Sequence, residues 1–148
     1  MKHPTMTAAV LALASIGVIA GVISAGASLE RVPVIRDQLV KTECGACHMA
    51  YQPWFLPANS WRKIMSGLPD HFGEDASLDE STRQKITQYL IKHAGRGSTG
   101  AGITITGLGW YKNEHRGEVS AKALKKAGSM ANCTACHSDA DRGLYDDD

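Results

Sequence analysis

The chain has 148 residues, which suffices for one compact domain or two very small ones and excludes a barrel enzyme or a two-domain dehydrogenase. With 16 Lys and Arg residues against 15 Asp and Glu residues, the formal net charge is +1. This balance argues against a nucleic-acid-binding protein, which usually carries a basic excess. Aromatic residues make up only 6% of the chain, a small share for building a large core.

The first 27 residues have the pattern of an export signal. A short positive start over residues 1–3 precedes an uncharged, mostly apolar stretch over residues 6–27. Ala25, Gly26 and Ala27 form the small-x-small pattern after which signal peptidase cuts. The alternative is an uncleaved anchor helix, because the stretch is long enough to cross a bilayer. In either case we expect the rest of the chain to lie outside the cytoplasm.

The residues that follow predict two short helices with a loop between them. We expect the first helix within residues 29–40 and the loop over residues 51–57, which contain two prolines. Asn59 or Ser60 can cap a second helix that runs to Leu68. One face of this helix is apolar at helical spacing, and it comprises Trp61, Ile64, Met65 and Leu68.

The clearest helix of the chain is expected after a turn at residues 69–73. Ser77 and Glu80 form an S-x-x-E capping box at its start, and Gly95 is expected to stop it. The apolar stripe of this helix comprises Ile86, Leu90 and Ala94.

A glycine-rich stretch over residues 95–102 predicts a linker between two halves of the chain. We therefore expect an N-terminal domain over residues 28–94 and a C-terminal domain over residues 103–148. In the second, residues 103–106 alternate as in a short strand, and residues 120–127 predict a short basic helix. The fold class is mainly α with little β structure.

All cysteines lie in two C-x-x-C-H motifs, at residues 44–48 and 133–137, and this motif is the attachment signature of a c-type haem. Each thiol bonds one vinyl group, and the adjacent histidine points at the iron from the same side. Two disulfides are the first alternative, but they would not require a histidine after each cysteine pair. A zinc site is the second, but the distance along the chain between the two cysteine pairs would be unusually long for it. A thioredoxin-like redox site is the third, but its C-x-x-C motif is expected only once. The sequence therefore predicts two covalent haems, whose rings supply missing core and pack near Trp61 and Trp110. The attachment residues are Cys44, Cys47, His48, Cys133, Cys136 and His137.

Each iron has one more axial position, and the remaining histidines compete for it. His71 lies in a turn after the first motif, and His115 lies before the second motif, roughly as its mirror image. His93 is expected near the end of a helix, where its positive form would suit the helix dipole. Met65 is a further candidate, although it fits an apolar helix stripe. On spacing we favour His71 and His115, because ligands on loops are freer to reach an iron.

Beyond the haem motifs, the chain resembles the bacterial dihaem cytochrome c family. The resemblance rests on residues 43–51 around the first motif, on the run D-H-F-G-E-D-A-S-L at residues 70–78, and on Trp110, His115 and residues 132–137. It implies a helical cytochrome with two haem-binding halves in which both irons are ligated by two histidines. His71 and His115 would be the distal ligands and His93 incidental. The resemblance leaves open which distal histidine serves which haem; pairing of neighbours, the simplest assignment, would place His71 opposite His48 and His115 opposite His137.

The resemblance also implies a periplasmic electron carrier. Such a protein shuttles electrons from a membrane cytochrome b or a soluble donor to a haem-protein acceptor, which for some family members is a small oxygen-binding monohaem cytochrome. Filled axial positions agree with a carrier, and histidine in place of methionine favours a low potential. One alternative is a dihaem peroxidase-like or gas-binding enzyme with one open haem site. Another is the haem subunit of a respiratory membrane complex, anchored by an uncleaved N-terminal helix.

Overall fold

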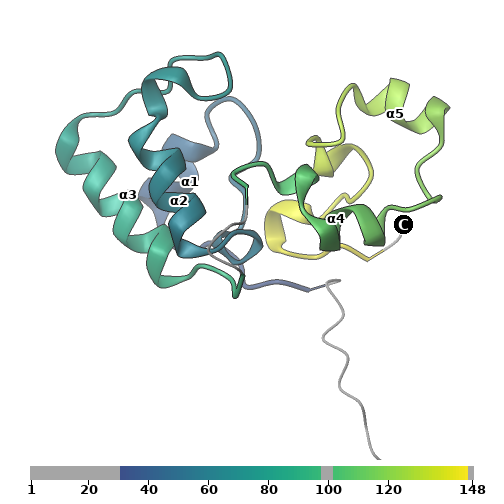
Figure 1. Cartoon of the computed structure of the whole chain (residues 1–148), viewed down its shortest axis with the longest axis horizontal. Coiled ribbons are helices and arrows are strands. Elements are labelled where there is room, and N and C mark those ends of the chain that lie inside the picture. The colour runs from purple at the N-terminus through teal and green to yellow at the C-terminus, as the bar shows by residue number, and fades with distance from the viewer. Residues whose placement is uncertain (1–30, 98–101, 147–148) are drawn as a thin grey trace, which may run out of the picture.

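The computed structural model describes residues 31–97 and 102–146, so the predicted export segment and residues 98–101 of the predicted linker lie outside the described residues. Figure 1 shows α1, α2 and α3 grouped on one side and α4 and α5 on the other. We call residues 31–97 the N-terminal half and residues 102–146 the C-terminal half. Within these residues the regular elements are helices and 3₁₀ turns, with only isolated β-bridges, which confirms the mainly α fold. None of the described helices is long and apolar enough to cross a membrane.

The first helix, α1 (Gln38–Cys44), begins later than the sequence predicts and runs into the first C-x-x-C-H motif. Asp37 caps it by accepting a backbone hydrogen bond at 3.1 Å. The predicted helix over residues 29–40 is therefore wrong in its placement. Residues before Asp37 pair with the end of the chain instead, where Val32 donates its backbone N–H to the carbonyl of Gly143 at 2.8 Å. A hydrogen bond to a distant segment has displaced the local helix.

A 3₁₀ turn, η1 (Pro53–Phe55), occupies the predicted loop, and α2 (Ala58–Ser66) follows it. Neither Asn59 nor Ser60 caps α2, because the helix already begins at Ala58 with Pro57 in the cap position. The hydroxyl of Ser60 donates to the carbonyl of Gly102 at 2.9 Å, a bond that links the two halves. The predicted apolar face is confirmed, since the side chains of Trp61, Ile64, Met65 and Leu68 are buried.

The third helix, α3 (Glu80–Lys92), has Asp79 as its cap, with a carboxylate oxygen accepting from the backbone of Thr82 at 3.0 Å. The predicted capping box of Ser77 with Glu80 is therefore wrong. The backbone N–H of Ser77 donates to the carboxylate of Asp75 at 2.9 Å, which leaves the cap position to Asp79.

Gly95 lies beyond the end of α3 rather than at it, because His93 is the C-cap. The backbone N–H of Gly95 donates to the carbonyl of Leu56 at 3.0 Å. A Cβ atom at this position would lie 1.8 Å from the carbonyl oxygen of Trp54, so only glycine fits. Glycine is therefore required at this position, but for a close approach of two backbone segments and not to end α3.

The core of the N-terminal half lies where α3 packs against α2 and α1 (Figure 1). Apolar side chains buried there remove surface from water at roughly 25 cal/mol per Å². The most deeply buried are Ile35, Val40, Leu56, Ile86 and Leu90.

The C-terminal half is built from short elements: η3 (Ile105–Gly107), α4 (Gly109–Glu114), α5 (Ala121–Ala127), η4 (Cys133–Ala135) and η5 (Ala140–Arg142). The predicted strand at residues 103–106 is wrong, because the backbone closes a 3₁₀ turn there with a hydrogen bond from Gly107 to Thr104 at 3.0 Å. The predicted basic helix at residues 120–127 is confirmed as α5, capped by Ser120.

One buried side chain joins the two halves. Gln52 is fully buried, and its amide nitrogen donates to the carbonyl of Ala140 at 2.7 Å. Its amide oxygen accepts from the hydroxyl of Tyr145 at 2.5 Å. Beside it, the ring of Phe55 stacks on Trp110 with 5.5 Å between centres. Both polar atoms of the amide are therefore satisfied by the C-terminal half.

Candidate haem sites

The first site lies between the end of α1 and the turn η2 (Leu68–Asp70). Cys44 is the last residue of α1, and His48 follows it after the C-x-x-C spacing. His71 directly follows η2 and is held by reciprocal backbone hydrogen bonds with Glu74 at 2.7 and 3.2 Å. The imidazole rings of His48 and His71 face each other with 6.2 Å between centres and planes 22° apart.

The second site lies between α4 and the segment from η4 to the end of the chain. Cys133 begins η4, His137 follows it, and His115 is the C-cap of α4. The ring centres of His115 and His137 are also 6.2 Å apart, but their planes are 84° apart. The structure therefore brings together His48 with His71 and His115 with His137, the two pairs that chain order led us to expect.

This spacing fits one metal ion between each pair of rings. An imidazole nitrogen lies about 2.0 Å from a ligated transition metal, so two imidazoles on opposite sides of one ion have ring centres about 6 Å apart. Both observed separations have this value. In each site a C-x-x-C pair adjoins one of the two rings. The donor set fits a covalently attached haem in both places.

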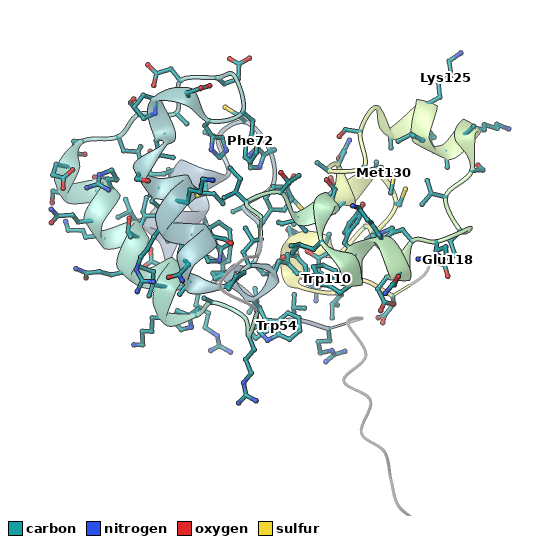
Figure 2. All side chains as sticks on the ribbon, viewed as in Figure 1. Trp54, Phe72, Trp110, Glu118, Lys125 and Met130 are labelled. Carbon is teal, nitrogen blue, oxygen red and sulfur yellow. The ribbon has the colours of Figure 1, made fainter. Side chains whose placement is uncertain are left out.

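A cavity of about 390 Å³ marks the second site. Its lining combines both cysteines and both histidines of the site with apolar and aromatic side chains, as expected of a haem cleft. Trp110 and Met130, which also line it, are labelled in Figure 2 together with Glu118 and Lys125 of the same half.

Short hydrogen bonds fix the tautomers of two of the histidines, and Nδ1 of His137 lies farther, 3.4 Å, from the carbonyl of Asp146. Nδ1 of His48 lies 2.7 Å from the carbonyl of Met49, and Nδ1 of His115 lies 2.9 Å from the carbonyl of Tyr111. Because a carbonyl only accepts, each Nδ1 carries the proton and each Nε2 keeps its lone pair for a metal.

Burial changes the titration of several groups in the two sites. It raises the pKa of the Cys44 thiol to about 11, with a further contribution from Glu43, and it also raises the pKa of Cys133. Burial lowers the pKa of His71 below its ordinary value of 6.5, and neighbouring His48 adds to this shift. The neutral form of His71, the form that ligates metals, is therefore favoured.

The other two ligand candidates take no part in these pairs. His93 is exposed at the C-cap of α3, where its ring lies against Tyr89 with 4.4 Å between centres. Met65 is only 3% exposed and belongs to the apolar core formed by α2 and α3. His93 thus has the helix-end position that the sequence predicts, without facing another histidine of the sites.

Three tyrosines that the sequence did not predict as part of the sites contact their histidines. Tyr51 lies on His48 with 4.9 Å between centres, and Tyr111 stacks on His115 at 4.0 Å. Tyr145 meets His137 edge-on at 5.5 Å. The spacing Tyr-x-x-x-His at the end of a helix could have indicated Tyr111, because residues four apart share a helix face.

Burial also raises the pKa values of these tyrosines. It raises the pKa of Tyr111 to about 12, and it raises those of Tyr51 and Tyr145 above their ordinary value of 10. Their hydroxyls therefore stay protonated and can donate hydrogen bonds at physiological pH.

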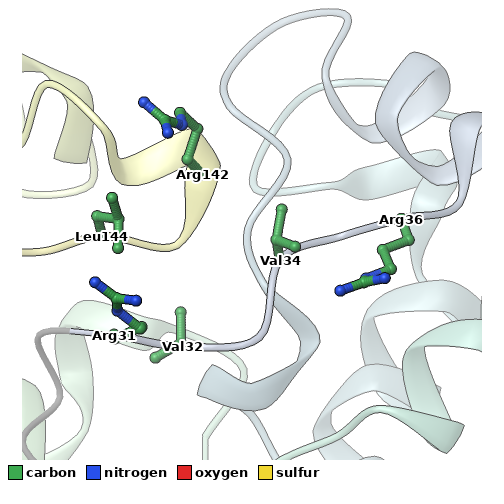
Figure 3. Close-up of a pocket in the computed structure, with 6 residues that line it drawn as sticks. All are labelled: Arg31, Val32, Val34, Arg36, Arg142 and Leu144. Carbon is green, nitrogen blue, oxygen red and sulfur yellow. The ribbon is translucent and has the colours of Figure 1, made fainter.

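A second hollow, of about 480 Å³, lies elsewhere, between the start and the end of the described chain (Figure 3). Three arginines line it, Arg31, Arg36 and Arg142, and Arg142 is paired with Asp139 at 3.1 Å. Its lining contains neither histidine nor cysteine, so it lacks the groups that hold a haem.

The model of the dihaem cytochrome c family matches residues 40–145, a span that contains both C-x-x-C-H motifs and all four facing histidines. The chain belongs to the dihaem cytochrome c family. The resemblance seen in the sequence is confirmed, and two c-type haems are the cofactors of this family member. Its general function is that of an electron-transfer haem protein.

Solved structures of dihaem cytochromes are similar to this one. The crystal structure of DHC purified from Rhodobacter sphaeroides has 53% sequence identity and a TM-score of 0.71, over 76% of this chain and 99% of that one. A second structure of diheme cytochrome c from the same organism has 48% identity, with the same TM-score and coverage. The diheme cytochrome type c of Shewanella baltica has 34% identity and a TM-score of 0.67, over 76% and 89% of the two chains. The comparison with curated proteins returned no match.

Proposed function

We propose that this dihaem cytochrome c is a bis-histidine electron carrier of the periplasm. The observation that supports it is the presence of two histidine pairs, each with 6.2 Å between ring centres and each beside its own C-x-x-C motif. In this proposal the four cysteines attach the haems, His48 and His137 are the proximal ligands, and His71 and His115 are the distal ligands. The attaching cysteines are Cys44, Cys47, Cys133 and Cys136.

The protein's contribution is to hold and orient these ligands. Hydrogen bonds from Nδ1 to backbone carbonyls leave the lone pair of Nε2 in His48 and His115 available to bind a metal. When bound, each haem iron supplies a one-electron couple between its ferric and ferrous states. If the two histidines of each pair hold the iron, no coordination position would stay open for a substrate, which favours a carrier over a peroxidase-like or gas-binding enzyme. Histidine in place of methionine favours a low potential.

The location and the partners belong to the same proposal. The export pattern of residues 1–27 supports a periplasmic site of action, with membrane contact only if that segment stays uncleaved. A membrane cytochrome b or a soluble cytochrome would be the donor, and a small monohaem cytochrome the acceptor. A formal charge of only +1 suits the small, short-lived interfaces of redox partners.

Spectroscopy of the purified ferric holoprotein tests the ligand assignment. Near-infrared magnetic circular dichroism with EPR should show two low-spin haems with two histidine ligands each. His71→Ala and His115→Ala should each remove one of the two low-spin signals and leave the other. His93→Ala, which changes an exposed histidine outside both pairs, should leave both signals intact.

Other results would contradict the proposal. A high-spin haem in the unmodified protein would mean an open iron site and would favour the enzyme alternative. A methionine-ligated haem would refute the double bis-histidine assignment, and Met65 would then be the residue to examine.

A further inference from the structure

Two tyrosine hydroxyls from different parts of the molecule donate to consecutive backbone carbonyls. The hydroxyl of Tyr51, in the N-terminal half, donates to the carbonyl of Ala131 at 2.7 Å. The hydroxyl of Tyr111, on α4, donates to the carbonyl of Met130 at 2.7 Å. Met130 and Ala131 are neighbours in the chain, just upstream of Cys133. The backbone of Met130 and Ala131 therefore accepts one hydrogen bond from each of the two tyrosines.

The rings of the same two tyrosines lie on histidines of different sites. Tyr51 stacks on His48 of the first pair, with planes 28° apart. Tyr111 stacks on His115 of the second pair, with planes 20° apart and 4.0 Å between ring centres. An unbroken series of ring contacts, hydrogen bonds and covalent bonds thus leads from His48 to His115.

We propose that Tyr51 and Tyr111, joined through the backbone of Met130 and Ala131, form the route by which electrons pass between the two haem sites. This inference rests on the proposed function, in which His48 and His115 are axial ligands. One electron moves, so the oxidation state of the donor iron rises by one and that of the acceptor iron falls by one. No bond forms or breaks, and both hydroxyls keep their protons. Electronic coupling falls off less steeply along bonds and hydrogen bonds than across gaps, which favours a continuous path.

A second connection exists, and its geometry is poorer. Tyr145 donates to the side chain of Gln52, the neighbour of Tyr51, and meets His137 of the second pair. Its ring approaches that histidine at 5.5 Å with planes 64° apart, compared with 4.0 Å and 20° for Tyr111 on His115. The route through Tyr111 has the closer and more parallel ring contact.

Removing single hydroxyl groups from the holoprotein tests this route. Tyr51→Phe and Tyr111→Phe keep each ring and delete its hydrogen bond. After flash-driven injection of one electron per molecule, time-resolved magnetic circular dichroism would follow its redistribution between the haems. We expect each variant to slow this redistribution several-fold. Because the coupling along one path is the product of its steps, the slowing in the double variant should be about the product of the slowing in the two single variants.

Tyr89→Phe is the matched control. The hydroxyl of Tyr89 accepts a hydrogen bond from the backbone N–H of Arg36 at 3.0 Å, and its ring lies on His93. That histidine belongs to neither pair, so the rate should not change. EPR of the resting proteins is the second measurement, and all variants should keep both low-spin signals.

Three outcomes would overturn the route. The first is an unchanged rate in Tyr51→Phe and Tyr111→Phe with both low-spin signals intact. The second is slowing by Tyr145→Phe alone, which would favour the other connection. The third is slowing that comes with altered EPR signals, which would show that the tyrosines position the haems rather than couple them. Failure of the proposed function would look different, because the unmodified protein itself would lack two low-spin haems.

Discussion

Backbone carbonyl groups orient the imidazole rings of His48 and His115. Nδ1 of His48 is directed at the carbonyl of the next residue, Met49, whereas Nδ1 of His115 is directed one helical turn back, at Tyr111. These local bonds fix the tautomer of each ring and help to orient it. Although the two pairs have equal spacing, their planes differ, at 22° for His48 with His71 and 84° for His115 with His137.

This difference predicts two distinguishable EPR signals from the ferric protein. Nearly parallel imidazole planes split the iron d orbitals that interact with the rings, whereas nearly perpendicular planes leave those orbitals almost equal in energy. We therefore expect a rhombic low-spin signal from the haem of His48 and His71. The haem of His115 and His137 should give a strongly anisotropic signal with a larger maximum g value. His115→Ala should remove the anisotropic signal, and two identical rhombic signals would contradict the ring geometry.

The ends of short helices carry the site residues. Cys44 ends α1, His71 follows η2, and His115 is the C-cap of α4. A helix end is where the backbone leaves its regular course, so a side chain there can be aimed at a neighbouring element. The longest helix, α3, contributes no histidine to either pair, and its role is to form the core against α2.

The cap of α3 gives a stability prediction with a pH dependence. Hydrogen bonds from Thr82 hold the pKa of Asp79 below its ordinary value of 3.8. The stability that this carboxylate contributes is therefore present above its ordinary pKa and is lost as the pH falls through the lowered one. We expect Asp79→Ala to lower the melting temperature at neutral pH by a few degrees, because the cap is lost. The deficit relative to the unmodified protein should shrink in acid.

Two further variants serve as controls for this measurement. Asp79→Asn can still accept from the backbone of Thr82, so it should keep much of the stability and lose its dependence on acid. Ser77→Ala should change the melting temperature little, because Ser77 does not cap α3. If Ser77→Ala were as destabilising as Asp79→Ala, the capping box predicted from the sequence would be correct after all.

The two halves are held together by a few specific contacts. The amide of Gln52 is bonded at both ends to the C-terminal half, and Phe55 stacks on Trp110. At the start of the described chain, Val32 bonds Gly143, whose positive φ of 77° and close approach to the Val32 carbonyl favour glycine. These contacts fix the position of one histidine pair relative to the other.

Gln52→Leu should therefore weaken the whole molecule. The carbonyl of Ala140 and the hydroxyl of Tyr145 would lose their partner in a dry interface, at a cost of about 1–3 kcal/mol for each group left unsatisfied. Chemical unfolding of the holoprotein, followed by far-ultraviolet circular dichroism, would measure the loss. Gln84→Leu, at an exposed glutamine bonded to Glu80, should have little effect. Equal stability of both variants would show that the Gln52 bridge contributes nothing.

Much of the chemistry could be predicted from the sequence because it is encoded locally. The spacing C-x-x-C-H places two thiols and an imidazole within one turn, so the cofactor follows from a few adjacent letters. The buried apolar face of α2 could likewise be predicted from the helical spacing of its apolar residues. The errors lie where a distant partner competes with a local signal, as for Ser60, which looks like a cap and instead bonds Gly102. The strand predicted at residues 103–106 failed for a related reason, since short-range alternation cannot reveal a 3₁₀ turn.

The pattern Tyr-x-x-x-His occurs at the ends of two helices, and only the tertiary structure shows which of its histidines belongs to a site. Tyr89 and His93 end α3 as Tyr111 and His115 end α4, with four-residue spacing, the histidine as C-cap and its ring lying on the tyrosine. In both, neighbouring residues alone produce this arrangement. Only His115 faces a second histidine, His137, because packing brings η4 and the end of the chain opposite α4 while leaving the end of α3 in solvent. Long-range packing, which no spacing in the chain encodes, thus distinguishes a candidate iron ligand from a surface histidine.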